Sequence, residues 1–115
     1  GNQPSTWQKS LLGAQRLRFI VNAMTRMRFI ENNDELDFSC KTSPNLAPDK
    51  LTPWFEITNK KLKVDQKVVF GHWASLNGKT HVSQFCGLDT GYVWGQNMTL
   101  LSLSSGKLYS VIYQQ

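Results

Sequence analysis

The stretch KVVFGHWASLNGK, residues 67–79, says most about how this chain folds. It opens with an apolar run rich in β-branched residues, the pattern of a buried strand. The run stops at Gly71 and His72, and the chain then becomes polar. A histidine at the end of such a strand is placed among the loops above a sheet edge, where α/β folds build their sites. His72 is therefore a candidate metal ligand or acid–base group, and the alternative is a purely structural histidine.

The residues after this stretch predict further strands. Residues 84–95, QFCGLDTGYVWG, contain a second apolar run. Residues 97–113, NMTLLSLSSGKLYSVIY, are expected to form two strands joined by a turn at residues 104–107, which is a hairpin pattern. The second apolar run ends in Asp89, whose carboxylate could either orient His72, as metal-bound histidines require, or cap its own turn. Spacing favours neither role.

Residues 1–30 are expected to be mainly helical, and the clearest pattern lies in residues 15–30. Apolar side chains recur there at helical spacing on one face: Leu17, Ile20, Met24 and Met27. Polar side chains recur at every fourth position on the opposite face: Arg18, Asn22 and Arg26. Residues 1–30 contain no acidic residue, so no neighbour along the chain neutralises these arginines. The polar face is therefore either a solvated basic surface or an anion-binding surface, since the planar fork of arginine fits two phosphate oxygens.

The middle of the chain, residues 31–60, is rich in prolines and other turn-forming residues. Trp54 and Phe55 follow one of these prolines, and we expect them to anchor an irregular segment in the core, with base stacking as the alternative. Residues 1–60 should thus form a helical and loop-rich segment, and residues 61–115 a mainly β segment. The sequence predicts an α/β fold of the α+β kind.

The composition excludes several classes of protein. At 115 residues the chain has the length of one domain or of a piece of one. Its 13 basic and 8 acidic residues give a net charge of +5, which suits anionic partners such as nucleotides or nucleic acid. No apolar run is long enough to span a membrane. Cys40 and Cys86 belong to no CxxC pair, so we expect no disulfide framework and a cytoplasmic location. Walker, HExxH and GxSxG motifs are missing, and His81 lies in a polar loop that should be exposed.

Four stretches, in this order, carry a resemblance to a known family: RLRFIVNAMTRMRF, SPNLAPDKLTPWFEI, VVFGHWASLNGK and LDTGYVWGQNMTLLSL. They resemble the C-terminal part of the symmetric bis(5′-nucleosyl)-tetraphosphatases, which are calcineurin-like metallophosphoesterases. The resemblance covers nearly the whole chain. It implies the C-terminal part of an αββα sandwich with a site for two divalent metal ions of the manganese, cobalt or magnesium type. Members of the family cleave diadenosine tetraphosphate (Ap4A) symmetrically into two ADP.

The resemblance also implies roles for individual residues. His72 matches the last metal-ligand histidine of the family, and Asp89 matches a motif beside the metal site. Arg18, Asn22 and Arg26 lie in the helical stretch expected near the polyphosphate of a dinucleoside polyphosphate substrate. The family's GDxHG, GDxVxRG and GNHE motifs, which supply most of the metal ligands, are not in this sequence. The chain is therefore expected to be a C-terminal fragment that is inactive alone.

Two other functions remain open. One is a small basic module that binds RNA or nucleotides through the arginines of the helix and through base stacking on the tryptophans: Trp7, Trp54, Trp73 and Trp94. These aromatic residues are scattered through apolar contexts rather than interleaved with basic ones, which disfavours nucleic acid. The other is a folded fragment without activity of its own, which would self-associate through exposed strand edges. No membrane partner is expected.

Overall fold

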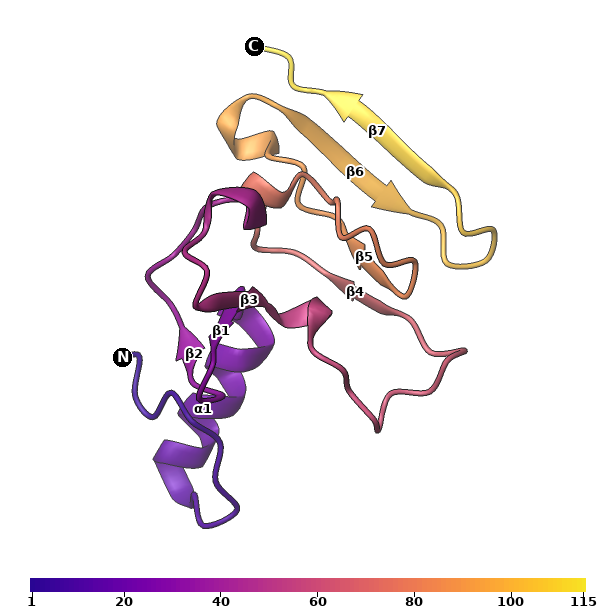
Figure 1. Cartoon of the computed structure of the whole chain (residues 1–115). Helices are drawn as coiled ribbons and strands as arrows, with labels where there is room; N and C mark the ends of the chain where they lie inside the picture. Colours follow the sequence, from indigo (N-terminus) through magenta and orange to yellow (C-terminus); the bar gives the residue numbers. More distant parts are fainter. The chain divides into compact units, whose positions relative to one another are not determined.

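The computed structural model describes residues 1 to 115, which form two compact units, Gly1–Thr58 and Asn59–Gln115. The first unit contains helix α1 and strands β1 to β3, and the second contains strands β4 to β7 (Figure 1). The chain begins with a helix and continues mainly with strands. This mixed α/β order was predicted for the C-terminal part of a metallophosphoesterase fold, so the predicted fold class is confirmed. None of the helices has the length and hydropathy needed to cross a membrane.

Helix α1 covers Gly13–Arg26, so the helical prediction for residues 1–30 is correct only for this part. Apolar residues recur within it three or four positions apart, which is the spacing of an amphipathic helix. The residues before it are irregular, and Pro4 lacks the backbone N–H that a helix would need. The helix ends at Arg26, and the extended backbone of the next residue, Met27, leads into β1, Phe29–Glu31.

Strand β1 is the central strand of a three-stranded antiparallel sheet, with β2, Leu36–Asp37, on one side and β3, Leu51–Pro53, on the other. Phe29 of β1 has no exposed surface, and burying such a side chain contributes roughly 2–3 kcal/mol. The large apolar residues of this unit that are buried are Leu11, Phe29, Leu36, Phe38, Leu51 and Phe55. Burial of Phe55 confirms its expected role as a core anchor. Trp54 is half-buried, and its ring meets that of Phe55 edge-on at 5.8 Å.

In the second unit, β4, Val68–Phe70, and β5, Phe85–Gly87, form a two-stranded parallel sheet. The strand predicted after residue 67 is therefore present, but the prediction that it is buried is wrong, because Val69 is 42% exposed. Parallel sheets are normally covered on both faces. Within this unit only one strand pairs with β4, and a sheet of two strands leaves part of its surface uncovered.

Strands β6, Asn97–Leu101, and β7, Leu108–Ile112, form an antiparallel hairpin, which confirms the hairpin prediction. The turn between them is closed by backbone hydrogen bonds from Ser102 N to Lys107 O (2.9 Å) and from Gly106 N to Ser102 O (2.8 Å). Every residue of β7 is exposed. The hairpin therefore carries open sheet surface, as the β4–β5 pair does.

Candidate functional site

Strands β4 and β5 end together at one edge of their sheet, which we call the carboxyl edge. Because the strands are parallel and Phe70 pairs with Gly87, the residues that follow both strands leave the sheet at this edge. A backbone hydrogen bond from Leu88 N to Phe70 O (2.9 Å) continues the pairing by one residue. His72 and Asp89 come next on their respective strands. The fold thus brings these two candidate residues to the same edge, where α/β folds bind ligands.

His72 is presented on a backbone that is unusual for its residue type. Its φ is 65°, in the left-handed region that residues other than glycine rarely adopt. The following residue, Trp73, is only 2% exposed and anchors the chain, whereas the His72 side chain is exposed. Three other residues share this conformation, Asp34, Asn77 and His81, so the backbone by itself does not single out His72.

Asp89 caps the turn that follows β5. Its Oδ1 accepts a hydrogen bond from Gly91 N (3.1 Å), which is one of the two roles that the sequence left open. No hydrogen bond joins Asp89 to His72 in this structure. The expected orienting role of Asp89 stays a prediction, and its Oδ2 oxygen is the atom that would serve it.

A chain of hydroxyl groups ties this turn to the hairpin. Thr90 Oγ1 donates to Asn97 O (2.7 Å) and lies 2.7 Å from Thr99 Oγ1, which in turn lies 2.8 Å from Ser110 Oγ. The loop after His72 packs closely against β5, because a Cβ on Gly78 would lie 2.7 Å from the carbonyl oxygen of Gly87. The carboxyl edge is therefore built on a fixed backbone.

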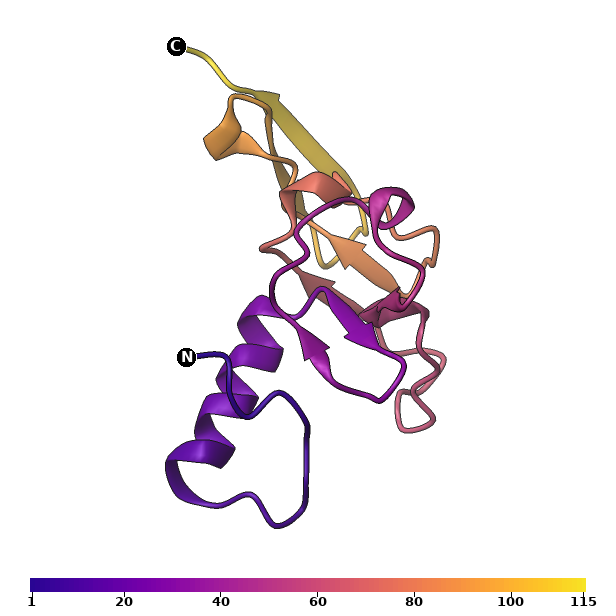
Figure 2. The same ribbon diagram turned by 60° about the vertical axis from the view of Figure 1, so that its left-hand side comes forward.

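The other three candidate residues lie in the first unit, on one face of α1 that we call the arginine face: Arg18, Asn22 and Arg26. Their alignment on one face follows from helical spacing, as predicted. The face carries the N-terminal segment, residues 1–8, which runs beside the helix (Figure 2). Arg18 Nη1 donates to Gln3 O (3.3 Å), and Asn22 Nδ2 donates to Gly1 O (2.9 Å).

Arg26 has the most contacts of the arginine face. It donates to Asn22 Oδ1 (3.1 Å) and to Asn2 Oδ1 (2.9 Å), and its guanidinium lies 4.6 Å from the centre of the Phe38 ring. Asn22 is only 6% exposed. Asn22 is therefore not part of a solvated surface, because the N-terminal segment covers it, whereas Arg26 is half-buried and Arg18 is exposed. All hydrogen-bond acceptors on this face are neutral, so the positive charge of the arginines is not cancelled.

The apolar face of α1 is the exposed one, which reverses the usual arrangement of an amphipathic helix. Met24 is 81% exposed, and Leu17 and Ile20 are also exposed, whereas Met27, just after the helix, is half-buried. Sequence periodicity correctly separated the two faces. It could not indicate which face the rest of the first unit would cover, because the partner of the polar face is the N-terminal segment.

The donors of this chain do not by themselves make a metal site. No group of three or more His, Cys, Asp or Glu side chains is placed to hold a metal ion, and a catalytic zinc site, for comparison, uses about three protein ligands. His72 fits the role of a single ligand, since its imidazole is exposed at the carboxyl edge. Its expected role as a metal ligand therefore stays a prediction that depends on ligands from outside these residues.

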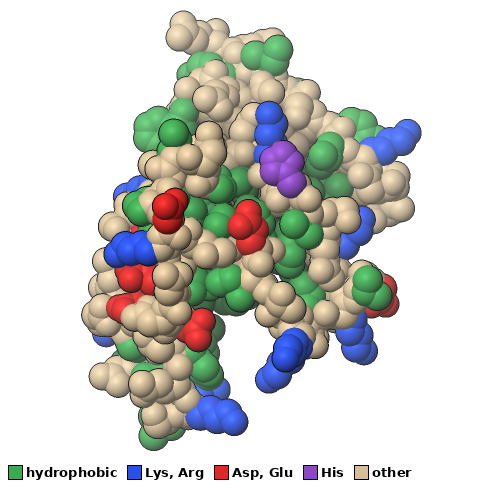
Figure 3. All heavy atoms as spheres, viewed as in Figure 1, with side chains coloured by type: hydrophobic (Ala, Val, Ile, Leu, Met, Phe, Trp, Pro, Cys, Tyr) green, Lys and Arg blue, Asp and Glu red, His purple; other side chains and the backbone are tan.

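A second basic stretch, residues 60–67, forms the loop that precedes β4, and Figure 3 shows blue side chains around this loop. Gln84 Nε2 fixes the loop by donating to Lys63 O (2.7 Å) and Gln66 O (2.8 Å). This loop is joined to the start of β4, whereas His72 follows the end of the same strand. The basic net charge of the chain therefore does not by itself mark the carboxyl edge.

The tryptophans of the RNA-binding alternative differ in their surroundings. The ring of Trp7 lies 5.4 Å from that of Phe19 and 4.8 Å from the Arg16 guanidinium. Trp54 meets Phe55, and Trp73 is buried. Trp7 is nevertheless 42% exposed, so Trp54 and Trp73 are the tryptophans that offer little stacking surface to such a module. Trp94 is the most exposed of the four, and no pattern in the sequence separated it from the others.

Comparison with known proteins extends this description. No family model matches the chain. A protein of Histophilus somni (strain 2336) is 50% identical over 100 residues, which make up 87% of this chain and 36% of that protein. A protein of Yersinia enterocolitica is 48% identical over 101 residues, or 88% of this chain and 34% of that protein. A protein of Coxiella burnetii is 42% identical over 114 residues, or 99% of this chain and 39% of that protein.

These matches relate the chain, with its basic helix and its parallel strand pair, to hydrolases. All three relatives carry the name symmetrical bis(5′-nucleosyl)-tetraphosphatase. The chain therefore matches a segment of the proteins of that family, and the resemblance is confirmed. The chain spans about a third to two-fifths of the length of these relatives.

Proposed function

We propose that residues 1–115 form part of a hydrolase that cleaves Ap4A symmetrically into two ADP. The observation that carries this proposal is the similarity of 87–99% of the chain to proteins named symmetrical bis(5′-nucleosyl)-tetraphosphatase. The carboxyl edge supports it, because His72 and Asp89 follow neighbouring parallel strands there. The proposal includes a cytoplasmic location, which rests on the two free cysteines, Cys40 and Cys86.

His72 would serve as one ligand of a metal centre that is completed by residues outside this chain. Two divalent ions of the manganese, cobalt or magnesium type, when bound, would supply an activated water and neutralise charge on the phosphate oxygens. The neutral imidazole of His72 would contribute one nitrogen donor. Asp89 would keep the adjoining turn in place through Gly91 and orient His72 through its second oxygen.

The arginine face would bind phosphate oxygens of the substrate. Arg18 and Arg26 now donate to neutral carbonyl and amide oxygens, and a phosphate oxygen is a stronger acceptor because it carries charge. Binding would exchange the neutral acceptors of the N-terminal segment for charged ones. The gain would be about 1–3 kcal/mol for each charge-assisted hydrogen bond.

The test is a chimera in which residues of this chain replace the matching segment of the Histophilus somni relative. We expect the folded chimera to hydrolyse Ap4A to ADP alone, with activity that a chelator abolishes. His72→Ala in the chimera should lose metal occupancy and most turnover, because one ligand is gone, whereas His81→Ala serves as the matched exposed control.

Two results would contradict the proposal. One is a folded chimera that hydrolyses no Ap4A or releases ATP and AMP, and the other is full activity of the His72→Ala variant. A smaller graft of residues 59–115 covers the case in which the whole graft fails to fold. The isolated chain should hydrolyse Ap4A no faster than buffer with metal, since it has no group of three metal-binding side chains.

A further inference from the structure

Trp94 is the tryptophan of this chain whose ring the structure leaves open. It is 76% exposed, and no ring contact or cation covers its indole. A large aromatic side chain gains free energy when it is covered, so an indole in this state needs an explanation. Trp7 is 42% exposed but packs against Phe19 and Arg16, Trp54 is half-buried against Phe55, and Trp73 is buried, so Trp94 is the most exposed of the four.

The backbone around Trp94 is fixed. It belongs to the 3-10 helix Tyr92–Trp94, which lies between Gly91 and Gly95, both with a φ of 82°. Backbone hydrogen bonds close this turn, from Trp94 N to Gly91 O (2.9 Å) and from Gly95 N to Tyr92 O (3.0 Å). The indole is therefore held out on a short rigid turn rather than on a mobile loop.

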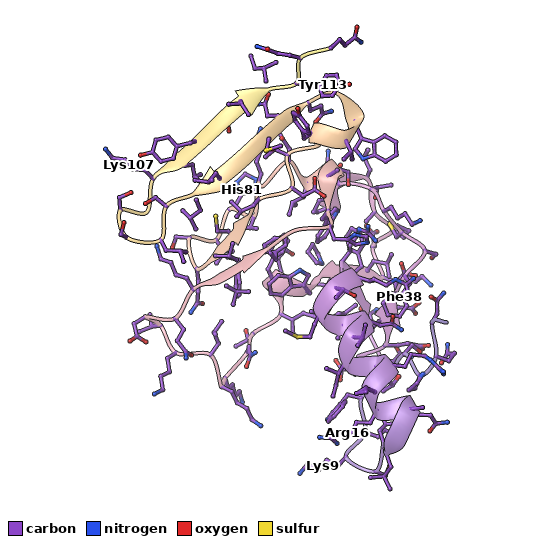
Figure 4. All side chains as sticks on the ribbon, turned by 180° about the vertical axis from the view of Figure 1, so that it is seen from behind. Lys9, Arg16, Phe38, His81, Lys107 and Tyr113 are labelled. Atoms are coloured by element: carbon purple, nitrogen blue, oxygen red, sulfur yellow. The ribbon has the colours of Figure 1, made fainter.

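The neighbouring aromatic residues anchor the turn from its other side. The rings of Tyr92 and Tyr113 meet edge-on at 5.2 Å, and Tyr113 N donates to Gln96 O (3.0 Å). Figure 4 shows Tyr113 next to the 3-10 helix at the end of the hairpin. These contacts involve Tyr92 and do not cover Trp94, two residues further on.

The turn that carries Trp94 is continuous with the carboxyl edge. It begins at Gly91, whose N–H is held by Asp89, and Asp89 itself follows β5. The chain therefore passes directly from a residue beside His72 in the parallel pair to an exposed indole. The exposed indole thus follows Asp89 by five residues along the chain.

We infer that Trp94 stacks on a nucleobase of the nucleotide that binds at the carboxyl edge. This inference rests on the proposed function, because a dinucleoside polyphosphate carries a base at each end of its phosphate chain. Phosphate oxygens bind to positive charge or to a metal ion, whereas a base stacks on a flat apolar surface. The indole of Trp94 supplies such a surface. Stacking tolerates every base, so Trp94 distinguishes nucleotides from bare polyphosphate rather than one base from another.

The first experiment uses the 115-residue chain and follows its tryptophan indole N–H signals by NMR. The probes are ADP and inorganic pyrophosphate, which share the phosphates and differ in the base. ADP should shift the indole signal that is missing from the Trp94→Phe spectrum, and pyrophosphate should not. The exposed aromatic Tyr109, on the hairpin, provides the matched control, and Tyr109→Ala should leave the ADP shift unchanged.

The second experiment measures the Ap4A hydrolysis of the chimera. Trp94→Ala should raise KM about 5- to 150-fold and leave kcat nearly unchanged, which corresponds to base stacking of roughly 1–3 kcal/mol at 1.4 kcal/mol per tenfold. Trp94→Phe should restore most of the loss, because it restores an aromatic face. Removal of an exposed side chain should not unfold the protein, and circular dichroism checks this.

Failure of this inference can be separated from failure of the proposed function. The inference is overturned if ADP shifts no Trp94 signal, if pyrophosphate shifts it equally, or if an active Trp94→Ala chimera keeps its KM. In the last case the proposed hydrolase function would stand. If ADP shifts the Trp94 signal but no folded chimera hydrolyses Ap4A, the base-binding surface would stand and the hydrolase function would fail.

Discussion

His72 and Asp89 each lie two residues beyond a paired strand residue, His72 after Phe70 of β4 and Asp89 after Gly87 of β5. Because the two strands are parallel, this equal spacing brings both residues out at one edge of the sheet. No hydrogen bond joins their side chains. The backbone of the strand pair, rather than a side-chain contact, therefore sets the relation between the two candidate residues.

Substitution of Asp89 separates its two roles. Asp89→Asn keeps an oxygen that can accept from Gly91 N, so the free energy of unfolding of the isolated chain should stay within about 0.5 kcal/mol of the original. In the chimera we expect the same variant to lower kcat about 10-fold or more, because the amide cannot replace a carboxylate that orients His72. Urea unfolding and Ap4A hydrolysis measure the two effects, and an unchanged kcat would restrict Asp89 to capping the turn.

The arginine face should contribute to substrate binding. Arg18→Ala or Arg26→Ala in the chimera should lower kcat/KM for Ap4A about 5- to 150-fold, which corresponds to roughly 1–3 kcal/mol for a charge-assisted hydrogen bond. Lys9→Ala, which removes an exposed charge outside this face, is the control and should have little effect. A loss well below 1 kcal/mol in both arginine variants would leave the arginines with only their structural contacts to the N-terminal segment.

Gly78 should tolerate substitution poorly for a steric reason. Its φ is 71°, and a Cβ there would lie 2.7 Å from the carbonyl oxygen of Gly87, which is backbone and cannot rotate away. Gly106 has a φ of 72° but open space around it, so it isolates the cost of the backbone conformation. We expect Gly106→Ala to lower the free energy of unfolding by about 1 kcal/mol and Gly78→Ala by at least about 2 kcal/mol. Equal losses in urea unfolding would show that β5 does not press against this loop.

Glu35 should make the stability of the first unit depend on pH in acid. Hydrogen bonds from Ser5 and then from Asn33 lower the pKa of the Glu35 carboxyl from its ordinary value of 4.5. A lowered folded-state pKa stabilises the fold fully above the unfolded-state value, and this contribution is lost as the pH falls through the folded-state value. Ser5→Ala should move the pKa back toward 4.5 and flatten this loss, as NMR titration and urea unfolding would show. Ser10→Ala, which alters an exposed hydroxyl, should leave the titration of Glu35 unchanged.

The hairpin should make the isolated chain associate with itself. One face of β6–β7 carries only apolar or aromatic side chains, and all of them are exposed: Met98, Leu100, Tyr109 and Val111. An open apolar sheet face next to unpaired strand edges favours association. We expect sedimentation to show concentration-dependent oligomers. Replacing the cross-strand pair with Leu100→Lys and Tyr109→Lys should reduce these oligomers. An unchanged distribution of oligomers would indicate association through the apolar face of α1 instead.

Local patterns in the sequence predicted α1 and the strands of the second unit, but not β1 to β3, which lie in residues expected to be helical or loop-rich. The spacing of Leu17 and Met24 predicted α1, and the turn residues near Gly106 predicted the hairpin, because both structures depend on neighbours along the chain. The parallel pairing of β4 with β5 depends on residues distant in sequence, and no local pattern encodes it. For the same reason, the contact of the N-terminal segment with the arginine face was not predicted.

The candidate residues show the same difference between local and non-local features. His72 and Asp89 could be selected because each ends an apolar run, and that feature is local. Trp94 could not be selected, since its exposure depends on Tyr92 and Tyr113 contacting each other and leaving it uncovered. Burial of Val69 was predicted wrongly, because an apolar run indicates a strand but does not indicate how many strands will flank it.

The crossover between β4 and β5 has a consequence for the order of folding. Residues 71–84 must form a loop before the parallel strands can pair, whereas only residues 102–107 must form a loop before β6 meets β7. The entropy cost of closing a loop grows with its length, and non-local pairing slows folding. Chain entropy thus favours early formation of the hairpin and late assembly of the edge that carries His72. Within the second unit, the candidate site therefore forms after the hairpin.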